Sequence, residues 1–302
     1  MESEAIGMKK TIRVGSRDSK LAVAQTMLML NEIEKCHPEI SFELITMKTT
    51  GDKILDRNLD QIGGKGLFVK ELDKALLDGR VDLTIHSLKD LPMEISKEIP
   101  IVGFSKREDP RDTLLVKKGS EEIFSCGLIG TSSRRRMEQL KKLYPEANYR
   151  GIRGNVQTRL RKLTEEGYDA TILAMAGLKR LGMEEYATKV FTTEEMIPAA
   201  GQGILAFQGK EGEDYSYLDC VCSKESKYAA TAERSFVKYL DGGCSSPIAA
   251  YAKVEGEEIT LRGLYYHEPA SDYSVGEITG KVTDAKILGE QLAKTLKEQW
   301  VS

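Results

Sequence analysis

Basic residues recur in this sequence at the points where predicted strands give way to helices. Arg17 follows the first predicted strand, Lys89 follows the third, and further arginines follow later strands, at 134–136, Arg153 and Arg180. In open α/β sheets, ligands bind beyond the carboxyl ends of the strands, where helix N-termini also point. One such arginine alone would be read as a solvated basic turn, but the repetition predicts a ligand with several carboxylates or phosphates.

The arginine run at 134–136 directly follows Ser133, a candidate helix cap. Arginine in the first turn of a helix faces the positive end of the helix dipole, so three in a row make an electrostatically unfavourable start. An anion bound there would relieve the conflict by pairing with the guanidinium groups and the backbone N–H groups.

Neither nucleotide-binding signature is present. The run Gly63-Gly64-Lys65-Gly66 lacks the spacing and the hydroxyl of a phosphate loop. The run Gly201-Gln-Gly-Ile-Leu-Ala fits a dinucleotide fingerprint formally, but it follows Pro198-Ala-Ala instead of a strand. We interpret it as a chance match or as a close-packed domain crossing.

Asp90 follows Lys89 at the end of a predicted strand and lies among cations. It can be a turn or cap residue, or a carboxylate kept anionic by Lys89 and the arginines so that it stabilises a cationic intermediate. His86 on the same strand is predicted to be a buried hydrogen-bonding residue, since no partner for a general base is evident.

Cys244 lies in the tight loop Asp241-Gly-Gly-Cys-Ser-Ser-Pro between a predicted helix and a predicted strand. A thiol on a loop can be presented as a nucleophile, although the local sequence alone favours a loop cysteine without function. Cys220 and Cys222 form an isolated pair that we assign to packing or surface. No histidine and cysteine spacing predicts a metal site.

Two series of alternating strands and helices must position these residues. In the first series we expect strands at 12–15, 42–47 and 81–86, with helices at 19–36 and 68–77. In the second we expect strands at 125–130, 149–152 and 169–174, with helices at 134–143, 156–166 and near Leu178. This alternation predicts two α/β domains with mainly parallel sheets and helices on both faces.

The last part of the chain predicts a small α+β domain. Its expected elements are a helix at 227–240, a hairpin of 248–253 and 258–266, a strand at 275–282 and a helix at 286–300. We place the hinge near 105–111 and a return crossing near 198–203. The predicted domains are therefore 1–105 with 200–222, then 106–199, then 223–302 with the cysteine.

Composition fits an ordinary soluble protein. Of 302 residues, 40% are hydrophobic and 30% are charged, and the net charge of −3 predicts no general affinity for nucleic acid. The acidic start lacks the apolar core of a secretion signal, and no apolar run approaches the ~20 residues that span a membrane. Five cysteines, an odd number, favour a reducing compartment, so we expect a cytoplasmic protein.

Nine motifs in order resemble the porphobilinogen deaminase (hydroxymethylbilane synthase) family over nearly the whole chain. They are Gly15-Ser-Arg-Asp-Ser-Lys-Leu-Ala, Gly63-Gly-Lys-Gly-Leu-Phe-Val-Lys-Glu-Leu, His86-Ser-Leu-Lys-Asp-Leu-Pro, Arg107-Glu-Asp-Pro-Arg-Asp, Gly130-Thr-Ser-Ser-Arg-Arg-Arg, Arg153-Gly-Asn-Val-Gln-Thr-Arg-Leu, Ala176-Gly-Leu-Lys-Arg-Leu-Gly, Ala200-Gly-Gln-Gly and Gly242-Gly-Cys. The resemblance implies two domains like the type-II periplasmic binding-protein fold, with the active site between them. It also implies a small third domain that carries Cys244.

The resemblance further implies an enzyme that condenses four porphobilinogen molecules head to tail, each with loss of ammonia, and then releases hydroxymethylbilane by hydrolysis. The chain would grow on a dipyrromethane cofactor joined to Cys244 by a thioether, and Asp90 would be the catalytic residue. A six-ring chain carries a dozen carboxylates, which accounts for arginines at several junctions.

Carried over residue by residue, the resemblance assigns further roles. The cofactor-binding residues would be Ser19, Lys65, Lys89, Thr131, Ser133, Arg135 and Arg136. The substrate-binding residues would be Arg17, Arg153, Arg159, Arg180 and Gln202. The loop through Lys65 and Phe68 is expected to act as a lid. Arg134 stands at a position that is often apolar in the family, so it is not carried over. Gln61 stands where some members have lysine, which is expected to weaken one contact of the lid.

The expected partner is the small-molecule substrate, with no nucleic acid and no membrane. We expect a monomer that could hand its product to the next enzyme of the pathway. Two alternatives remain: a non-catalytic two-domain protein that binds a polycarboxylate, and an acyl- or phosphoryl-transfer enzyme. The first gives Cys244 no role, and the second lacks a nucleophile–base pair and a phosphate loop.

Overall fold

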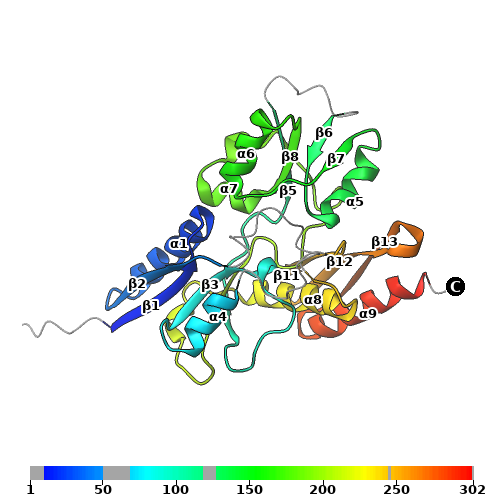
Figure 1. Cartoon of the computed structure of the whole chain (residues 1–302). Coiled ribbons are helices and arrows are strands. Elements are labelled where there is room, and N and C mark those ends of the chain that lie inside the picture. Colours follow the sequence, from blue (N-terminus) through cyan, green and yellow to red (C-terminus); the bar gives the residue numbers. More distant parts are fainter. Residues whose placement is uncertain (1–9, 50–68, 118–126, 244–245, 301–302) are drawn as a thin grey trace, which may run out of the picture.

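The computed structural model describes residues 10–49, 69–117, 127–243 and 246–300, which form three sheets with their helices (Figure 1). The first unit is a five-stranded sheet in the order β2-β1-β3-β10-β4. Its strands are β1 (Lys10–Arg17), β2 (Ile40–Met47), β3 (Leu83–Ser87), β4 (Ile101–Phe104) and β10 (Leu205–Gly209). β1 runs parallel to β2 and β3, whereas β10 is antiparallel to β3 and β4.

Helices α1 (Lys20–Cys36) and α4 (Lys70–Leu77) cover the two faces of this sheet. Val14 belongs to the core cluster that contains Leu30 of α1. At the next residue, Gly15, an added Cβ would lie 3.1 Å from Leu72 of α4. Because successive residues of a strand point to opposite faces, the two helices lie on opposite sides of β1.

The second unit repeats this arrangement with the order β7-β6-β8-β5-β9. Its strands are β5 (Asp112–Val116), β6 (Leu128–Gly130), β7 (Asn148–Arg150), β8 (Ala170–Ala174) and β9 (Lys189–Val190). Its helices are α5 (Arg134–Leu143), α6 (Val156–Glu165) and α7 (Met175–Leu181). β6 is parallel to β7 and β8, and β5 is antiparallel to β8 and β9, so each sheet holds one reversed strand in the same place.

The chain crosses twice between these two units, and the crossings lie against each other. Ser105 and Leu205 exchange two hydrogen bonds, of 2.9 and 3.0 Å, and Glu108 N donates to the carbonyl of Gly203. Gly203 has φ +89°, and an added Cβ there would lie only 2.3 Å from the carbonyl oxygen of Glu108. The glycines of the Gly201-Gln-Gly run therefore serve a close-packed crossing, one of its two predicted interpretations.

The third unit is a three-stranded antiparallel sheet with two helices on one face. It consists of α8 (Lys224–Tyr239), β11 (Ala249–Glu255), β12 (Glu258–His267), β13 (Asp272–Lys281) and α9 (Ala285–Glu298). The buried carboxylate of Glu233 in α8 accepts hydrogen bonds of 2.7 Å from Arg107, Gly201 N and Ala252 N. This one side chain thus ties both crossings to the third sheet.

The predicted fold class, two α/β units and a small α+β unit, is confirmed. Helix α5 has the predicted bounds, and α1, α6, α8 and α9 begin and end within three residues of those predicted. Strands β4, β5, β9 and β10 were not predicted from the sequence. Residue 68 at the start of the predicted 68–77 helix, and residues 125–126 of the predicted strand, lie outside the described residues.

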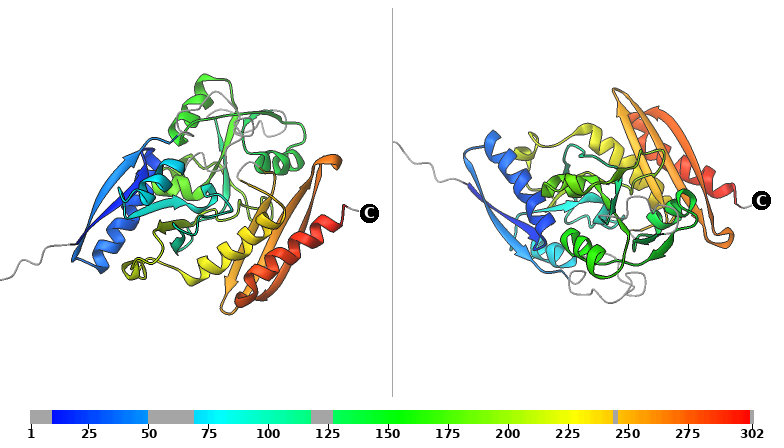
Figure 2. Two further views of the ribbon diagram at one scale, coloured as in Figure 1. Left: turned by 60° about the horizontal axis from the view of Figure 1, so that its bottom comes forward. Right: turned by 90° about the horizontal axis from the view of Figure 1, so that it is seen from above.

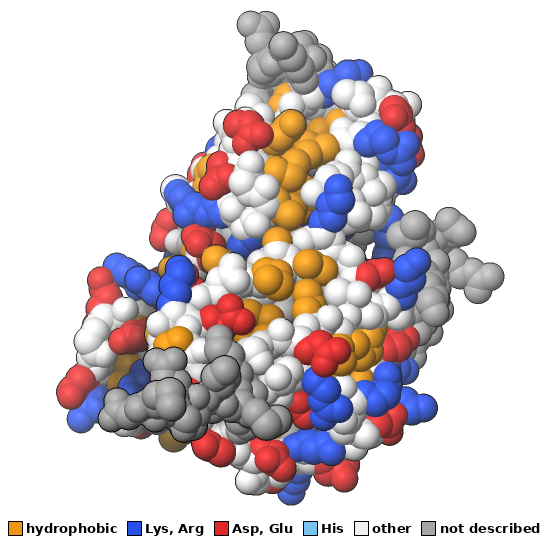
Figure 3. All heavy atoms as spheres, turned by 90° about the vertical axis from the view of Figure 1, so that its left-hand side faces the viewer, with side chains coloured by type: hydrophobic (Ala, Val, Ile, Leu, Met, Phe, Trp, Pro, Cys, Tyr) orange, Lys and Arg blue, Asp and Glu red, His pale blue; other side chains and the backbone are white. Residues whose placement is uncertain are grey.

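Figure 2 shows the three units arranged around the two crossings, with the third unit beside α5 of the second. On the face drawn in Figure 3, Lys and Arg side chains are mixed with Asp and Glu, and a strip of hydrophobic side chains runs between them. Among the described residues, no helix is both long enough and apolar enough to span a membrane.

Candidate active site between the first and second units

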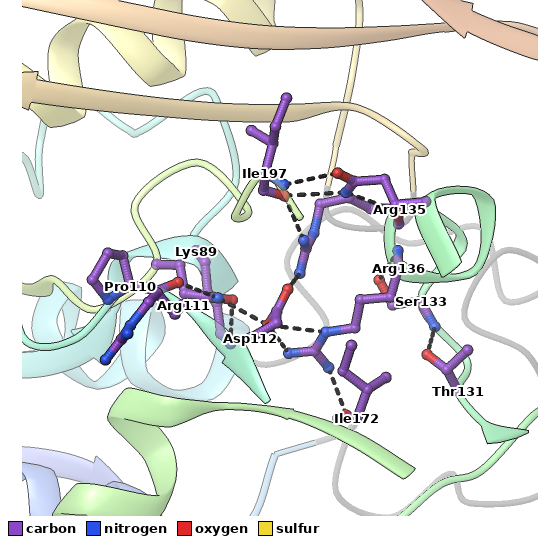
Figure 4. A network of polar contacts seen from close by, with 12 residues as sticks. Lys89, Pro110, Arg111, Asp112, Thr131, Ser133, Arg135, Arg136, Ile172 and Ile197 are labelled. Carbon is purple, nitrogen blue, oxygen red and sulfur yellow. Dashed lines mark hydrogen bonds and ion pairs between the residues drawn. The ribbon is translucent and has the colours of Figure 1, made fainter. Parts of the chain in front are cut away.

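A buried carboxylate, Asp112, lies at the centre of the site, as the first residue of β5. Its Oδ1 accepts hydrogen bonds from Nη2 and Nε of Arg136 at 2.7 and 3.2 Å, and its Oδ2 pairs with Nη2 of Arg135 at 2.8 Å (Figure 4). The arginines also donate to the carbonyls of Ile197 and Ile172. Burial would raise the pKa of Asp112, but the two guanidinium groups outweigh burial and hold this pKa well below its usual range.

Gln202, on the return crossing, connects this carboxylate to the first unit. Its side-chain amide donates to Asp112 Oδ1 at 2.9 Å and to the carbonyl of Pro110 at 2.6 Å. Its carbonyl oxygen accepts a hydrogen bond of 3.3 Å from Nζ of Lys89. Gln202 is only 1% exposed, so its amide bridges the units inside the molecule.

The local sequence explains why the two arginines reach Asp112. β6 ends at Gly130, and α5 begins four residues later with Ser133 as its N-cap, accepting from Arg136 N at 3.5 Å. Thr131 Oγ1 accepts from Ser133 N at 3.2 Å and holds the turn in place. The predicted cap is confirmed, and it directs the first turn of α5 toward the first unit.

The positive charge of the site exceeds its negative charge. Burial, with the like charge of Arg136, lowers the pKa of Lys89 to about 8, although Asp90 and Asp112 act in the opposite direction. Burial also lowers the pKa of Arg159 to about 10, helped by the charges of Arg136 and Arg153 and opposed by Asp90. Such lowered pKa values mark a place where an added anion would be stabilised.

Asp90 belongs to the short 3₁₀ turn Leu88–Asp90 that directly follows β3. It lines a small pocket with Arg17, at the end of β1, and with His86. Asp90 also interacts electrostatically with Arg159 of the second unit. The structure thus brings Asp90, Arg17 and Arg159 to one place between the two sheets.

His86 is buried as predicted, and its Nε2 lies 2.9 Å from Oγ1 of Thr84. Burial and the nearby charge of Arg17 lower the pKa of His86 to about 4. The imidazole is therefore neutral near pH 7, which supports a hydrogen-bonding role for it.

The second unit supplies two more predicted residues from the start of α6. Asn155 caps this helix by accepting from Thr158 N at 2.8 Å, and Nε of Arg159 donates to the carbonyl of Gly154 at 2.9 Å. Arg153 lies in the loop before the cap, and its Nε is buried without a hydrogen-bond partner in the described part of the chain. A buried guanidinium N–H without an acceptor is costly, so this atom is suited to an anionic ligand.

Two other predicted residues make contacts with the crossings or with α1. Arg180 Nη2 donates to the carbonyl of Gly203 at 2.6 Å, on the return crossing, and Ser19 caps α1 by accepting from Ala22 N. Lys65 and Cys244 lie outside the described residues, as do Gln61 and Phe68 of the predicted lid.

Asp112 is the residue that the sequence analysis missed. It closes the Arg107-Glu-Asp-Pro-Arg-Asp motif and begins the run Asp-Thr-Leu-Leu-Val, whose first four residues are buried. A carboxylate at the start of an otherwise apolar buried strand was the available signal, because such a group is rarely buried unless it is paired.

Sequence profiles of known families match both parts of the chain. The profile described as porphobilinogen deaminase, dipyromethane cofactor binding domain, matches residues 12–217, and that of the porphobilinogen deaminase C-terminal domain matches residues 227–298. The chain belongs to the porphobilinogen deaminase family.

Two known porphobilinogen deaminases are similar to this chain over nearly its whole length. A porphobilinogen deaminase from Acetivibrio thermocellus is 54% identical over 282 residues, which cover 93% of this chain and 96% of that protein. One from Ruminiclostridium josui is 50% identical over 288 residues, covering 95% and 98%. Among solved structures, the substrate binding domain 2 of GlnP from Lactococcus lactis has a TM-score of 0.42 at 12% identity and covers 71% of this chain and 87% of its own.

Membership in the porphobilinogen deaminase family confirms the predicted enzyme, a transferase of porphyrin biosynthesis with a dipyrromethane cofactor. The alternative of a non-catalytic binding protein is not favoured. The residues present fit this cofactor, because pyrrole rings with acetate and propionate groups bring carboxylates to a site with excess positive charge. The unpaired Nε of Arg153 and the lowered pKa values of Lys89 and Arg159 are the structural signs of that fit.

Proposed function

We propose that this enzyme condenses four porphobilinogen molecules stepwise on a dipyrromethane primer held by Cys244, with Asp90 as the catalytic carboxylate. The observation that supports the proposal is the concentration of positive charge around Asp90 and Asp112. The charge of Arg136 acts on both Lys89 and Arg159 there, and both of these groups have lowered pKa values.

The residues that would hold the primer carboxylates are those with donors directed into the site. Arg135 and Arg136 each keep contacts to Asp112, but a guanidinium has five N–H donors, so each can bind a carboxylate as well. Lys89 adds a third positive charge, and the proposed set also includes Ser19, Lys65, Thr131 and Ser133. When bound, the cofactor supplies the free pyrrole carbon to which the first substrate ring is joined.

We assign the incoming substrate to Arg17, Arg153 and Arg159. Arg17 lines the pocket of Asp90, Arg159 interacts electrostatically with Asp90, and Arg153 lies near enough to act on Arg159. Bidentate pairing of arginine with the acetate and propionate groups would orient the ring. Arg180 and Gln202 bind the crossings through Gly203 and Pro110, so their contacts support a role in shaping the site from behind.

Asp90 would act on the cation that forms when porphobilinogen loses ammonia. A carboxylate beside that azafulvenium-like cation stabilises it by charge, and it can accept a hydrogen bond from the pyrrole N–H. After the new carbon–carbon bond forms, the same carboxylate can receive the proton that leaves the ring. Lys89 and Arg159 both interact electrostatically with Asp90, and they would bind the carboxylates of the primer and of the substrate respectively.

Several wider assignments go with this proposal. We place the domain bounds at 1–105 with 200–222, at 106–199 and at 223–302, in keeping with the two crossings. We further propose a cytoplasmic monomer that passes its product to the next enzyme of the pathway. The mixed charges of the face in Figure 3 are compatible with a protein that binds neither nucleic acid nor membrane.

The intact mass of the purified protein tests the proposal. We expect an excess of two pyrrole units, absent from Cys244→Ser and retained in Cys220→Ser. Cys220 is the matched control, because its thiol donates to the carbonyl of Tyr217 at 3.6 Å in the first unit. An unmodified mass in folded, active protein would overturn the proposal.

A further inference from the structure

Helix α5 of the second unit is bound to the third unit at its first residue. Arg134 pairs with Glu268 at 2.7 Å, and its guanidinium lies 5.7 Å from the ring centroid of Tyr266. Tyr266 is in β12, and Glu268 begins the turn between β12 and β13. The family resemblance had left Arg134 without a role, and this contact gives it one.

The last turn of the same helix makes a second contact of the same kind. Lys142 Nζ lies 2.7 Å from Asp272 Oδ1 and 3.8 Å from the ring centroid of Tyr273, both at the start of β13. Eight residues of helix separate Arg134 from Lys142, which is about 12 Å along the axis. Both ends of α5 are therefore fixed to one hairpin, which lies beside α5 in Figures 1 and 2.

A buried link joins α5 to the same sheet between these two contacts. Arg135 and Gln139 donate to the carbonyl of Ile197 at 2.7 and 3.1 Å, and Ile197 N donates to Gln139 Oε1 at 2.7 Å. The Ile197 side chain is buried in a cluster with Ala249 and Leu264 of the third unit. α5 is thus packed as an element of the second and the third unit together.

We propose that Arg134 and Lys142 are positioning residues, which clamp α5 onto the β12–β13 hairpin and fix the place of Arg135 and Arg136 relative to the third unit. In the sequence, Cys244 comes shortly before β11, whose first residue Ala249 packs against Ile197. The clamp rests on the proposed function, because it matters only if the arginines bind the primer that Cys244 carries.

The two ion pairs of the clamp are exposed, so breaking them should change the orientation of α5 without unfolding the protein. The side chains of Arg134 and Glu268 are 34% and 60% exposed, and those of Lys142 and Asp272 are 50% and 51% exposed. Exposed ion pairs contribute little to folding stability. Reversing their charge should therefore misplace α5 without unfolding the protein.

The test is the double variant Arg134→Glu/Lys142→Glu, prepared as holoenzyme. Two exposed pairs lost together should lower kcat about fivefold. KM for porphobilinogen should stay within about twofold, because Arg17, Arg153 and Arg159 are untouched. Adding Glu268→Arg/Asp272→Lys restores both pairs with swapped charges and should return kcat to within about twofold of the wild type.

The matched control is Arg161→Glu, which breaks an exposed ion pair with Glu165 inside α6 and should leave kcat unchanged. A kcat of the double variant equal to that of the control would overturn the clamp, and so would a loss of kcat that the swap does not rescue. Should the double variant fail to fold, Glu268→Gln/Asp272→Asn tests the same contacts from the third unit. Failure of the proposed function is separate, since it shows as a missing primer mass in the wild-type protein.

Discussion

The side-chain amide of Gln202 donates to the carboxylate of Asp112 at 2.9 Å, and this bond joins the return crossing to the first strand of the second sheet. The side-chain carbonyl of Gln202 accepts a hydrogen bond from Lys89 of the first unit. Gln202 therefore contacts both Asp112 and Lys89. The network is a set of buried contacts between the first and the second unit, and the charges proposed to hold the primer belong to it.

Replacing Asp112 should destabilise the whole site. Asp112→Asn leaves Arg135 and Arg136 buried without their counter-charge, and breaking such a pair costs about 3–5 kcal/mol. We expect the midpoint of thermal unfolding, measured by circular dichroism, to fall by about 5–10 °C. Glu165→Gln, which removes an exposed ion pair, is the control, and an equal effect in both variants would contradict the prediction.

The destabilisation caused by Asp112→Asn should depend on pH. The native pKa of Asp112 lies below its usual range, so its stabilising effect is complete above the pKa of an unfolded aspartate, about 3.9. The effect is lost only as the pH falls below that value toward the native pKa. The difference in unfolding midpoint between wild type and Asp112→Asn should therefore be constant from pH 5 to 8 and shrink below pH 4.

Asp90→Asn should remove turnover and spare the fold. Asp90 lines the pocket with Arg17, and the amide keeps its size but not its charge. The loss of one electrostatic group in a catalytic site commonly lowers kcat by about 10²–10³. Steady-state kinetics with porphobilinogen and the unfolding midpoint check this, with Asp78→Asn, an exposed carboxylate at the end of α4, as the control. Normal product formation by Asp90→Asn would remove this residue from the mechanism.

Local signals in the sequence predicted the helices and proposed residues for the candidate site, whereas the pairings between distant parts of the chain were not predicted. Ser133 as a cap and the arginines after it need only neighbouring residues to be recognised. β10 pairs with β3, which lies more than a hundred residues earlier in the chain, and no local sequence pattern indicates that pairing. Asp112 was missed for the same reason, because its partners Arg136 and Gln202 are 24 and 90 positions away.

Loss of the positive charge of Lys89 should lower kcat/KM at alkaline pH. Its pKa is lowered to about 8, so the ammonium that would bind carboxylates is present below that pH and is lost as the pH rises through it. Bound carboxylates favour the charged form, so the limb of kcat/KM should lie at or above pH 8. Lys89→Arg should move the limb upward by a unit or more, about the gap between the two residue types. If the alkaline fall of kcat/KM is unchanged in Lys89→Arg, another group is responsible for it.

His86 should make the fold sensitive to acid. Its native pKa of about 4 lies below the unfolded value of about 6.5, so the unfolded state binds the proton first as the pH falls. The contribution of neutral His86 to the free energy of unfolding is complete above pH 6.5. It is lost progressively as the pH falls to 4, by about 3 kcal/mol in all. In His86→Gln, the unfolding midpoint should decline less steeply across this window. His37→Gln, at the surface end of α1, should follow the wild-type curve, and identical slopes in all three proteins would refute the assignment.

The two crossings should tolerate no side chain at Gly203. A left-handed residue with a Cβ costs about 1–2 kcal/mol, and this cost alone applies to Gly212→Ala, where φ is +83° and nothing lies within 4 Å of the added atom. At Gly203, φ is +89° and the added Cβ would also lie 2.3 Å from the backbone oxygen of Glu108, so the crossings must separate. We expect the unfolding midpoint of Gly203→Ala to fall at least twice as far as that of Gly212→Ala, with a loss of kcat that Gly212→Ala does not show. Equal midpoints would mean that the crossings can separate freely, and that the Gln202–Asp112 bond does not depend on their close approach.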